Sequence, residues 1–359
     1  MKKRIAFIVA TQYDNVGDLL INKCLIDELS NYADVYLDTK NVPDSFKEKL
    51  LFGTQNVFEL DELTPYSFKG VGVANLFFSR TGITHVFKSP GPFGSGGDTK
   101  KFLRNILIGL IFFAFRLKST KSFLVGNDLL HKHKLDKIGA RFFSTSTEKI
   151  LCRSHNNIEE LKSLGIKNVN YIPDMCFGLK TEPIHNLEKK KIGISFRNLK
   201  DEKLHEYIVT SINNLITYYK NSDVEIVFFH QVKSDFIYTK ELYEIFQSNK
   251  NISFEERCLE WEDLSFYNDF RLVLSNRLHV LLLGLVYEAI PIGVLNSDSK
   301  TMKIFNIFKG IGIDNLLYEK LSVEDIDRVF STERDLFSKI KLVRSEQKKL
   351  LSKRISELF

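Results

Sequence analysis

The chain has 359 residues, of which 43% are hydrophobic and 27% are charged, with a formal net charge of +6. This balance excludes a disordered chain, and the length predicts two domains around separate cores. The mild positive charge suits anionic substrates or an acidic membrane surface. Because the lysines are spread out, and neither a zinc-finger spacing nor an RNP-like aromatic motif is present, we predict no nucleic-acid binding.

Strands and helices alternate through the first half of the chain. A strand over Arg4–Ala10 leads through a loop into a helix from about Asp18 to Tyr32, where leucines recur at helical spacing. The glycine-rich stretch from Ser89 to Gly97 is predicted to be a loop. Further strands are predicted at Asp34–Leu37, Thr84–Lys88, Ser122–Val125 and Lys149–Cys152. This alternation predicts a parallel sheet with helices on both faces.

The same pattern restarts after a polar linker at Thr181–Lys191. Strands are predicted there at Ile192–Phe196, Val224–Phe229, Phe270–Leu274 and Ile292–Val294. We therefore predict an α/β fold of the GT-B-like type, with two doubly wound Rossmann-type domains facing across a cleft. The predicted divisions are an N-terminal Rossmann-like domain at 1–182, a C-terminal Rossmann-like domain at 190–330, and a helical tail at 331–359.

Two features bear on where the protein works. The four cysteines are far apart and form no C-x-x-C pair, as in a reduced cytoplasmic protein. Residues 100–118 hold an apolar run with basic flanks, shorter than the roughly 20 residues that span a bilayer. This segment is either a helix buried between the sheet and the partner domain or an interfacial helix on acidic lipid at the inner face of the membrane.

The first domain offers two candidate anion sites. Asn15-Val16-Gly17-Asp18 lies between the first strand and the first helix, where free backbone N–H groups suit an anion or a polar sugar group. Asp18 is equally well explained as a helix N-cap. Arg153 ends a predicted strand, and a planar guanidinium there can bind a carboxylate or a phosphate. The alternative for Arg153 is a surface arginine paired with an acid.

The second domain carries the more informative residues. Its first strand ends in Ser195-Phe196-Arg197. Another strand ends in Ser275-Asn276-Arg277-Leu278-His279, directly before an apolar helix, and Lys300 follows about twenty residues later. Arg277 can bind an anion while His279 transfers protons. A lone histidine at a helix start is usually structural, but the neighbouring Arg277 and Lys300 favour a functional one.

These motifs, in this order, resemble the polysaccharide pyruvyl transferases over roughly residues 4 to 315. The resemblance implies a GT-B-like fold, phosphoenolpyruvate as the donor, and transfer of pyruvate as a ketal to two hydroxyls of a sugar. The expected product is a cell-surface polysaccharide or its precursor. No metal and no other cofactor is expected, because no His, Asp and Glu cluster has metal-ligand spacing.

The donor's chemistry assigns roles to the candidate residues. Its carboxylate and phosphate need at least two cations, which we predict to be Arg153 and Arg277, beside Leu278 and with Arg197 or Lys300 assisting. Either His279 or Lys300 protonates C3 of the donor. Asp18 is the candidate base for the sugar hydroxyl, with Asn15 and Gly17 on the acceptor side.

The sequence departs from the family pattern in the first domain. The family's usual glycine triplet is replaced by the Ser89–Gly97 segment, and its usual Arg-Asp is Arg153-Ser154. These differences affect the acceptor more than the donor, so the acceptor, free or linked to a nucleotide or a lipid, stays open. Two alternatives also stay open: a GT-B glycosyltransferase with a nucleotide-sugar donor, and a catalytically inactive sugar-binding or scaffold protein.

Overall fold

The computed structural model describes residues 3–69, 73–181, 189–296 and 299–359, with only the backbone described for 299–301. The chain forms two compact units: residues 1–13, 18–178 and 348–359 make the first, and residues 14–17 and 179–347 make the second. The division at 347/348 falls within helix α12 (Glu333–Ser356). Thus the region that the sequence set apart as a tail, 331–359, is shared between the two units.

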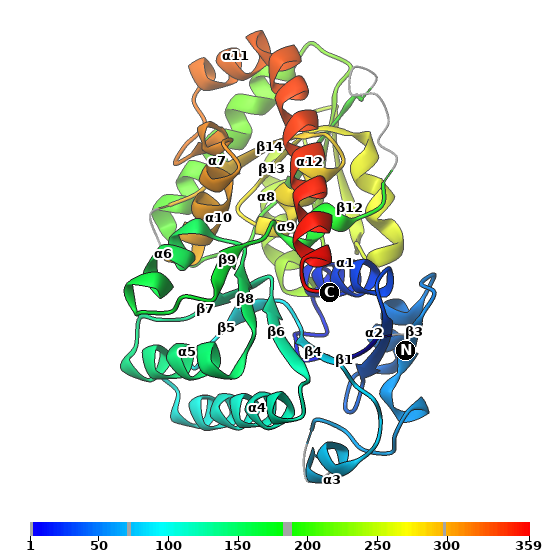
Figure 1. The fold of residues 1–359 in the computed structure, drawn as a ribbon. Coiled ribbons are helices and arrows are strands. Elements are labelled where there is room, and N and C mark those ends of the chain that lie inside the picture. The colour runs from blue at the N-terminus through cyan, green and yellow to red at the C-terminus, as the bar shows by residue number, and fades with distance from the viewer. Residues whose placement is uncertain (1–2, 70–72, 182–188, 297–298) are drawn as a thin grey trace. The chain divides into compact units, whose positions relative to one another are not determined.

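The first unit is built on a parallel sheet with the strand order β3-β2-β1-β4-β6-β8-β9 (Figure 1). Its strands are β1 (Arg4–Ile8), β2 (Asp34–Asp38), β3 (Val57–Glu59), β4 (His85–Lys88), β6 (Lys121–Val125), β8 (Lys149–Cys152) and β9 (Val169–Tyr171). The order reverses between β1 and β4, as in a doubly wound fold.

Helices cover both faces of this sheet because its strands are apolar on both sides. One face packs against α4 (Thr99–Leu117), α5 (Lys134–Ser146) and α6 (His155–Ser163). On the other face the ring of Phe87 lies 6.5 Å from that of Phe359, just beyond the end of α12. The remaining helices of this unit are α1 (Val16–Ser30), α2 (Asp44–Leu51) and α3 (Val73–Phe78).

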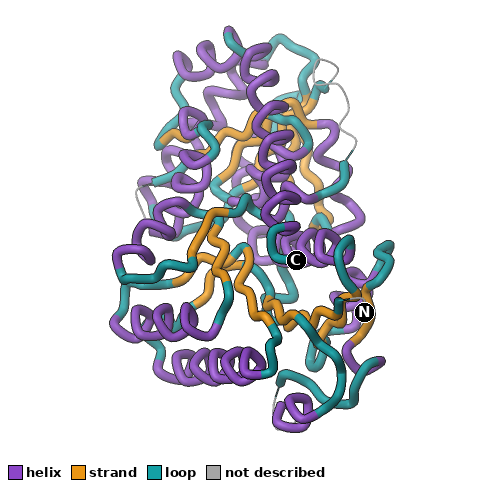
Figure 2. Tube along the Cα trace, in the orientation of Figure 1, coloured by secondary structure: helices purple, strands orange, loops and turns teal. Residues whose placement is uncertain are grey.

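The second unit repeats the design with the strand order β12-β11-β10-β13-β14-β15. Its strands, orange in Figure 2, are β10 (Lys191–Ser195), β11 (Glu225–His230), β12 (Ile252–Cys258), β13 (Phe270–Ser275), β14 (Ile290–Val294) and β15 (Leu317–Tyr318). Helix α9 (Leu278–Val286) is apolar and buried almost throughout. The other helices are α7 (Glu202–Tyr219), α8 (Phe236–Phe246), α10 (Ser299–Gly310) and α11 (Val323–Ser331).

Local differences from the prediction have simple causes. The loop predicted at 89–97 contains a short strand, β5 (Gly91–Phe93), which pairs with β7 (Asn127–Leu129). Gly91, at φ 118°, starts this strand in a conformation that glycine alone adopts readily. Most of the predicted linker, 182–188, lies outside the described residues.

Candidate functional site

The ends of β10 and β13 bring two of the predicted motifs together. The two strands pair in parallel with Ser195 opposite Ser275, so the residues that follow leave the sheet at the same edge. There the Arg197 backbone N–H donates to Asn276 Oδ1 at 2.8 Å, and Asn276 Nδ2 donates to the Arg197 carbonyl at 2.9 Å. The Asn276 side chain therefore fixes the loop that carries Arg197, whose own side chain is exposed.

Arg277 begins helix α9 as its N-cap residue. Its backbone N–H donates to Ser275 Oγ at 2.9 Å, and its guanidinium binds the Asp235 carboxylate through both Nε and Nη2, with Nε at 2.7 Å from Oδ2. The side chain of Arg277 stays 17% exposed, whereas that of Asp235 is only 3% exposed. Asp235 accepts from two of the five N–H donors of the Arg277 guanidinium. The ion pair therefore orients the guanidinium without using all of its donors.

His279 lies in the first turn of α9, two residues after Arg277. It packs on Gly17 so closely that a Cβ atom there would lie 2.2 Å from His279 Nδ1. Asn15 Oδ1 accepts the Gly17 N–H at 2.9 Å, and Asn15 forms an antiparallel bridge with Val232. Residues 14–17 thus belong to the second unit, and the Asn-x-Gly motif and His279 are parts of one arrangement.

The structure changes the explanation for Gly17. Gly17 is not among the residues with positive φ, so no tight turn requires a glycine there. It lies within α1, where alanine would normally be preferred. The need for glycine is steric, because the imidazole of His279 occupies the place of a side chain.

A second histidine lies in this unit that the sequence did not single out. His230 ends β11, the strand beside β10, and is 2% exposed. Burial lowers the pKa of His230 below its ordinary value, against the opposite effect of the Asp235 charge. The imidazole stacks on Phe254 and meets Phe236 edge-on. A histidine at the end of an apolar strand has no motif around it, so sequence patterns could not distinguish it from a core residue.

Arg153 has a different environment from Arg277. It is 3% exposed and lies between two carboxylates: Nε donates to Asp128 at 2.9 Å and Nη1 donates to Asp174 at 2.8 Å. Burial opposes the charge, but the two aspartates outweigh it and raise the pKa of Arg153 above its ordinary value. Its charge is compensated by two protein acids, Asp174 with a buried side chain and Asp128 with one that is 18% exposed. Arg153 is thus paired with acids, as the alternative from the sequence has it, but it is buried and does not lie on the surface.

The other predicted residues are dispersed. Asp18 is half-buried in the first turn of α1, in the first unit, where its carbonyl accepts from Asn22 Nδ2 at 2.7 Å. Leu278 is 4% exposed and packs in the second core. Lys300 lies in α10, but its side chain is outside the described part of the chain. Within that part no group of three or more His, Cys, Asp or Glu could hold a metal ion.

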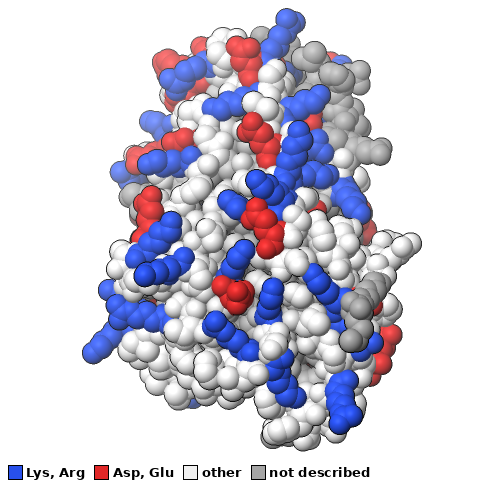
Figure 3. All heavy atoms as spheres, viewed as in Figure 1, with Lys and Arg blue, Asp and Glu red and all other residues white. Residues whose placement is uncertain are grey.

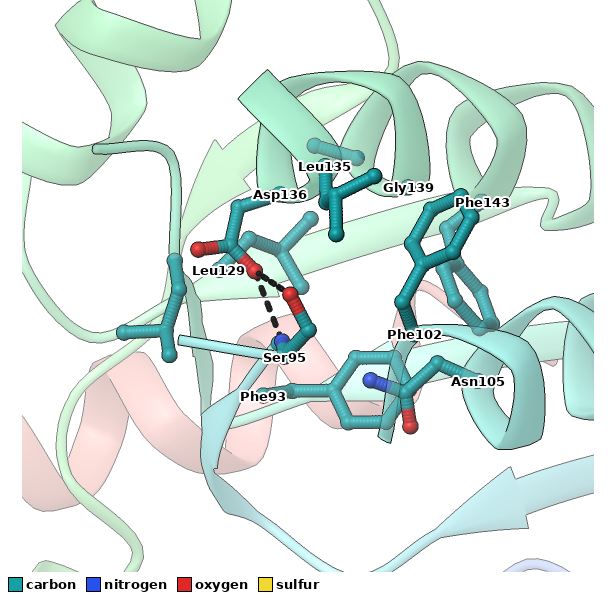
Figure 4. Close-up of a pocket in the computed structure, with 12 residues that line it drawn as sticks. Phe93, Ser95, Phe102, Asn105, Leu129, Leu135, Asp136, Gly139 and Phe143 are labelled. Carbon is teal, nitrogen blue, oxygen red and sulfur yellow. Dashed lines mark hydrogen bonds between the residues drawn. The ribbon is translucent and has the colours of Figure 1, made fainter. Parts of the chain in front are cut away.

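A small pocket lies in the first unit, beside the unusual 89–97 segment (Figure 4). Asp136 Oδ1 accepts from the Ser95 N–H at 2.6 Å and from Ser95 Oγ at 2.7 Å, which ties this segment to α5. The lining is otherwise mostly apolar, with Phe93, Phe102 and Phe143. No predicted site residue lines it, and an apolar lining does not suit a small dianion.

Taken together, two doubly wound units with cationic, imidazole and amide side chains at strand ends define an α/β protein of the GT-B type. Residues 15–298 match the family model described as polysaccharide pyruvyl transferase. The match covers most of the chain, so the chain belongs to the polysaccharide pyruvyl transferase family, as its motifs indicated.

Solved structures of similar fold cover nearly the whole chain. A UDP-N-acetylglucosamine 2-epimerase has a TM-score of 0.63 at 13% identity, over 99% of this chain and 95% of that one. The UDP-GlcNAc 2-epimerase from Neisseria meningitidis, bound to UDP-GlcNAc, has a TM-score of 0.60 at 12% identity, over 99% and 98%. Anabaena Alr3699/HepE, in complex with UDP and glucose, has a TM-score of 0.56 at 12% identity, over 99% of both chains.

At these identities the likeness is one of fold, and it confirms the predicted GT-B type. No curated protein matches the sequence.

Proposed function

We propose that this chain transfers the pyruvyl group of phosphoenolpyruvate, as a ketal, to two hydroxyls of a sugar in a cell-surface polysaccharide or its precursor. The observation that carries the proposal is the placement of Arg277 and His279 in one turn at the end of β13, in a chain of the pyruvyl transferase family. The Arg277 fork, oriented by Asp235, would bind a carboxylate or phosphate of the donor.

The proposed chemistry begins with protonation of donor C3, which becomes the methyl group and leaves C2 electrophilic. His279 is the proposed acid because it lies in the same turn as Arg277; Lys300 is the second candidate. One sugar hydroxyl adds to C2 and loses its proton. The second hydroxyl then displaces inorganic phosphate and closes the ketal, so both ketal oxygens come from the sugar. Asp18 stays our candidate base for the acceptor, beside Asn15 and Gly17.

Arg197 and Arg153 have different roles in this proposal. Arg197 is exposed on a loop held by Asn276 and is free to assist Arg277 in binding the donor. Arg153, by contrast, already compensates Asp128 and Asp174, so we propose that it positions the end of β8 rather than binding the donor. A guanidinium whose charge is already compensated by two carboxylates does not favour a third anion.

The test compares donor binding to two matched arginine variants. Arg277 follows the carboxyl end of β13, while Arg271 lies near the amino end of the same strand in a similar bidentate pair with Glu333. Phosphoenolpyruvate at 100 times its Kd should stabilise the wild type by about 2.7 kcal/mol, seen as a higher melting temperature. Arg277→Lys keeps the positive charge but loses the planar, bidentate guanidinium, and should weaken phosphoenolpyruvate binding by about tenfold or more.

Arg271→Lys should bind the donor like the wild type. Equal stabilisation of both variants, or none of the wild type, would remove Arg277 from the donor site. Activity would be measured as phosphate release from phosphoenolpyruvate across free, nucleotide-linked and lipid-linked sugars. Release that requires a sugar, with a pyruvate ketal in the product, is the expected result.

A second candidate is a glycosyltransferase with a nucleotide-sugar donor. What favours it is the fold, because similar solved structures hold UDP-GlcNAc or UDP. In the same melting experiment UDP, GDP and CMP should leave the wild type unchanged if the donor is phosphoenolpyruvate. Stabilisation by a nucleoside diphosphate, without any by phosphoenolpyruvate, would favour the glycosyltransferase instead.

A further inference from the structure

Helix α4 exposes a line of large apolar side chains on one face. Leu103, Leu107, Leu110 and Leu117 are 50–73% exposed, and Phe113 is 45% exposed. Their spacing of three and four residues places the leucines along one side of the helix, over about 21 Å. The opposite side of α4 is buried, so one face of the 100–118 segment is packed within the protein and the other is open to solvent.

The helix is firmly supported from beneath. It packs on α5 so closely that a Cβ atom at Gly109 would lie 2.5 Å from the ring of Phe142. Near its end, Lys118 lies over the ring of Phe77 in α3, with its Nζ 4.3 Å from the ring centroid, and the neighbouring Phe78 is 76% exposed. The exposed leucines therefore stand on a packed element of the first unit and not on a loose loop.

The charge around this face is predominantly positive. Residues 98–147 contain ten lysines and arginines and three aspartates, a formal net charge of +7 against +6 for the whole chain. Asp136 is buried against Ser95 and Asp128 pairs with Arg153, so Asp98, the exposed N-cap of α4, is the aspartate that lies among the exposed cations. In Figure 3 the surface over α4 and α5 is accordingly white and blue.

We propose that α4 is a docking helix for an anionic lipid membrane, with its leucine face in the interfacial layer and the flanking cations at the headgroups. Charge complementarity selects this occupant: apolar side chains bordered mainly by cations fit an acidic bilayer surface. No helix in the described part of the chain is long and apolar enough to cross a membrane, so α4 would lie along the surface. The proposal is independent of the donor and of the acceptor.

The first test replaces exposed leucines. Leu107→Gln/Leu110→Gln should weaken binding to vesicles of phosphatidylcholine with 30% phosphatidylglycerol, by about tenfold, because two half-exposed leucines no longer gain burial in lipid. The control, Ile237→Gln/Leu342→Gln, removes residues of similar exposure (69% and 57%) from α8 and α12, and should bind like the wild type. Circular dichroism and urea unfolding check that all variants are folded.

The second test replaces charges. Lys100→Gln/Arg104→Gln should weaken binding about 25-fold at low salt, at about fivefold per cation. Lys339→Gln/Lys341→Gln makes the same change in net charge elsewhere and should leave binding intact. Wild-type protein should not bind vesicles of phosphatidylcholine alone. Absence of binding to anionic vesicles, or equal losses in test and control variants, would overturn the proposal.

The same leucine face could instead pair two copies of the chain, and sedimentation distinguishes this case. The wild type should be unchanged in oligomeric state by Leu107→Gln/Leu110→Gln. A dimer that the substitution dissociates, without any vesicle binding, would overturn the proposal in favour of a dimer interface.

Discussion

The contact between Gly17 and His279 makes a sharp prediction for Gly17→Ala. An alanine in α1 should by itself stabilise the chain by about 0.5–1 kcal/mol, because it restricts the unfolded state and favours the helix. Here its Cβ atom would lie 2.2 Å from Nδ1 and 2.9 Å from Cγ of His279, so the imidazole or the backbone must move. Overpacking of this kind costs about 1–3 kcal/mol. The expected net effect of Gly17→Ala is a fall in the free energy of unfolding of about 1–2 kcal/mol.

Urea unfolding followed by tryptophan fluorescence measures this loss. The single tryptophan, Trp261, lies in the second unit, to which residues 14–17 and His279 also belong. In a His279→Ala background the obstacle is absent, and Gly17→Ala should become neutral or slightly stabilising. Of the three atoms nearest to the added Cβ, the two of His279 are then gone and Asn15 Oδ1, at 3.2 Å, remains. If Gly17→Ala destabilised both backgrounds equally, the two effects would be additive and the steric explanation would be refuted.

Two further predictions concern buried charge. Arg153→Met should destabilise the first unit by about 3–5 kcal/mol in urea unfolding, since it leaves the carboxylates of Asp128 and Asp174 without a cation; a loss below about 1 kcal/mol would contradict the structural role. Burial lowers the pKa of His85 to about 4, so the unfolded chain binds more protons and stability should fall as the pH drops below about 6.5. From pH 7 to pH 5 the free energy of unfolding should fall by about 2 kcal/mol more in the wild type than in His85→Phe. Equal losses would refute the lowered pKa of His85.

The sequence predicted the architecture well because its two signals, the short apolar strands and the helices between them, are local patterns. Apolar strands of about five residues, alternating with helices, require a parallel sheet covered on both faces. It also placed Arg197 and Arg277 each at the end of a predicted strand, and the structure pairs these two strands in parallel, so both residues leave the sheet at one edge. The short strand β5 was missed, since three residues amid glycines give no periodicity to detect.

The partners of the site residues could not be predicted in the same way. Asp235 lies 42 positions before Arg277, and Gly17 is still farther in sequence from His279. No spacing rule connects such pairs, because their contact depends on how whole strands and loops are arranged. Gly17 shows the consequence: its residue type was noticed, but the reason for it became visible only with the imidazole in place.

Arg153 and Arg277 show how this limit affects function. Each follows a parallel strand and precedes a helix, so the sequence gives both the same expectation of anion binding. The difference lies in the acids that distant segments bring to them. Arg153 meets two carboxylates and is 3% exposed, whereas Arg277 meets one and stays 17% exposed. A single carboxylate orients a guanidinium and leaves donors for a ligand, while two compensate its charge within the protein. The carboxylates that contact each arginine therefore decide whether its guanidinium can bind a substrate, and this comparison favours Arg277 as the donor-binding cation.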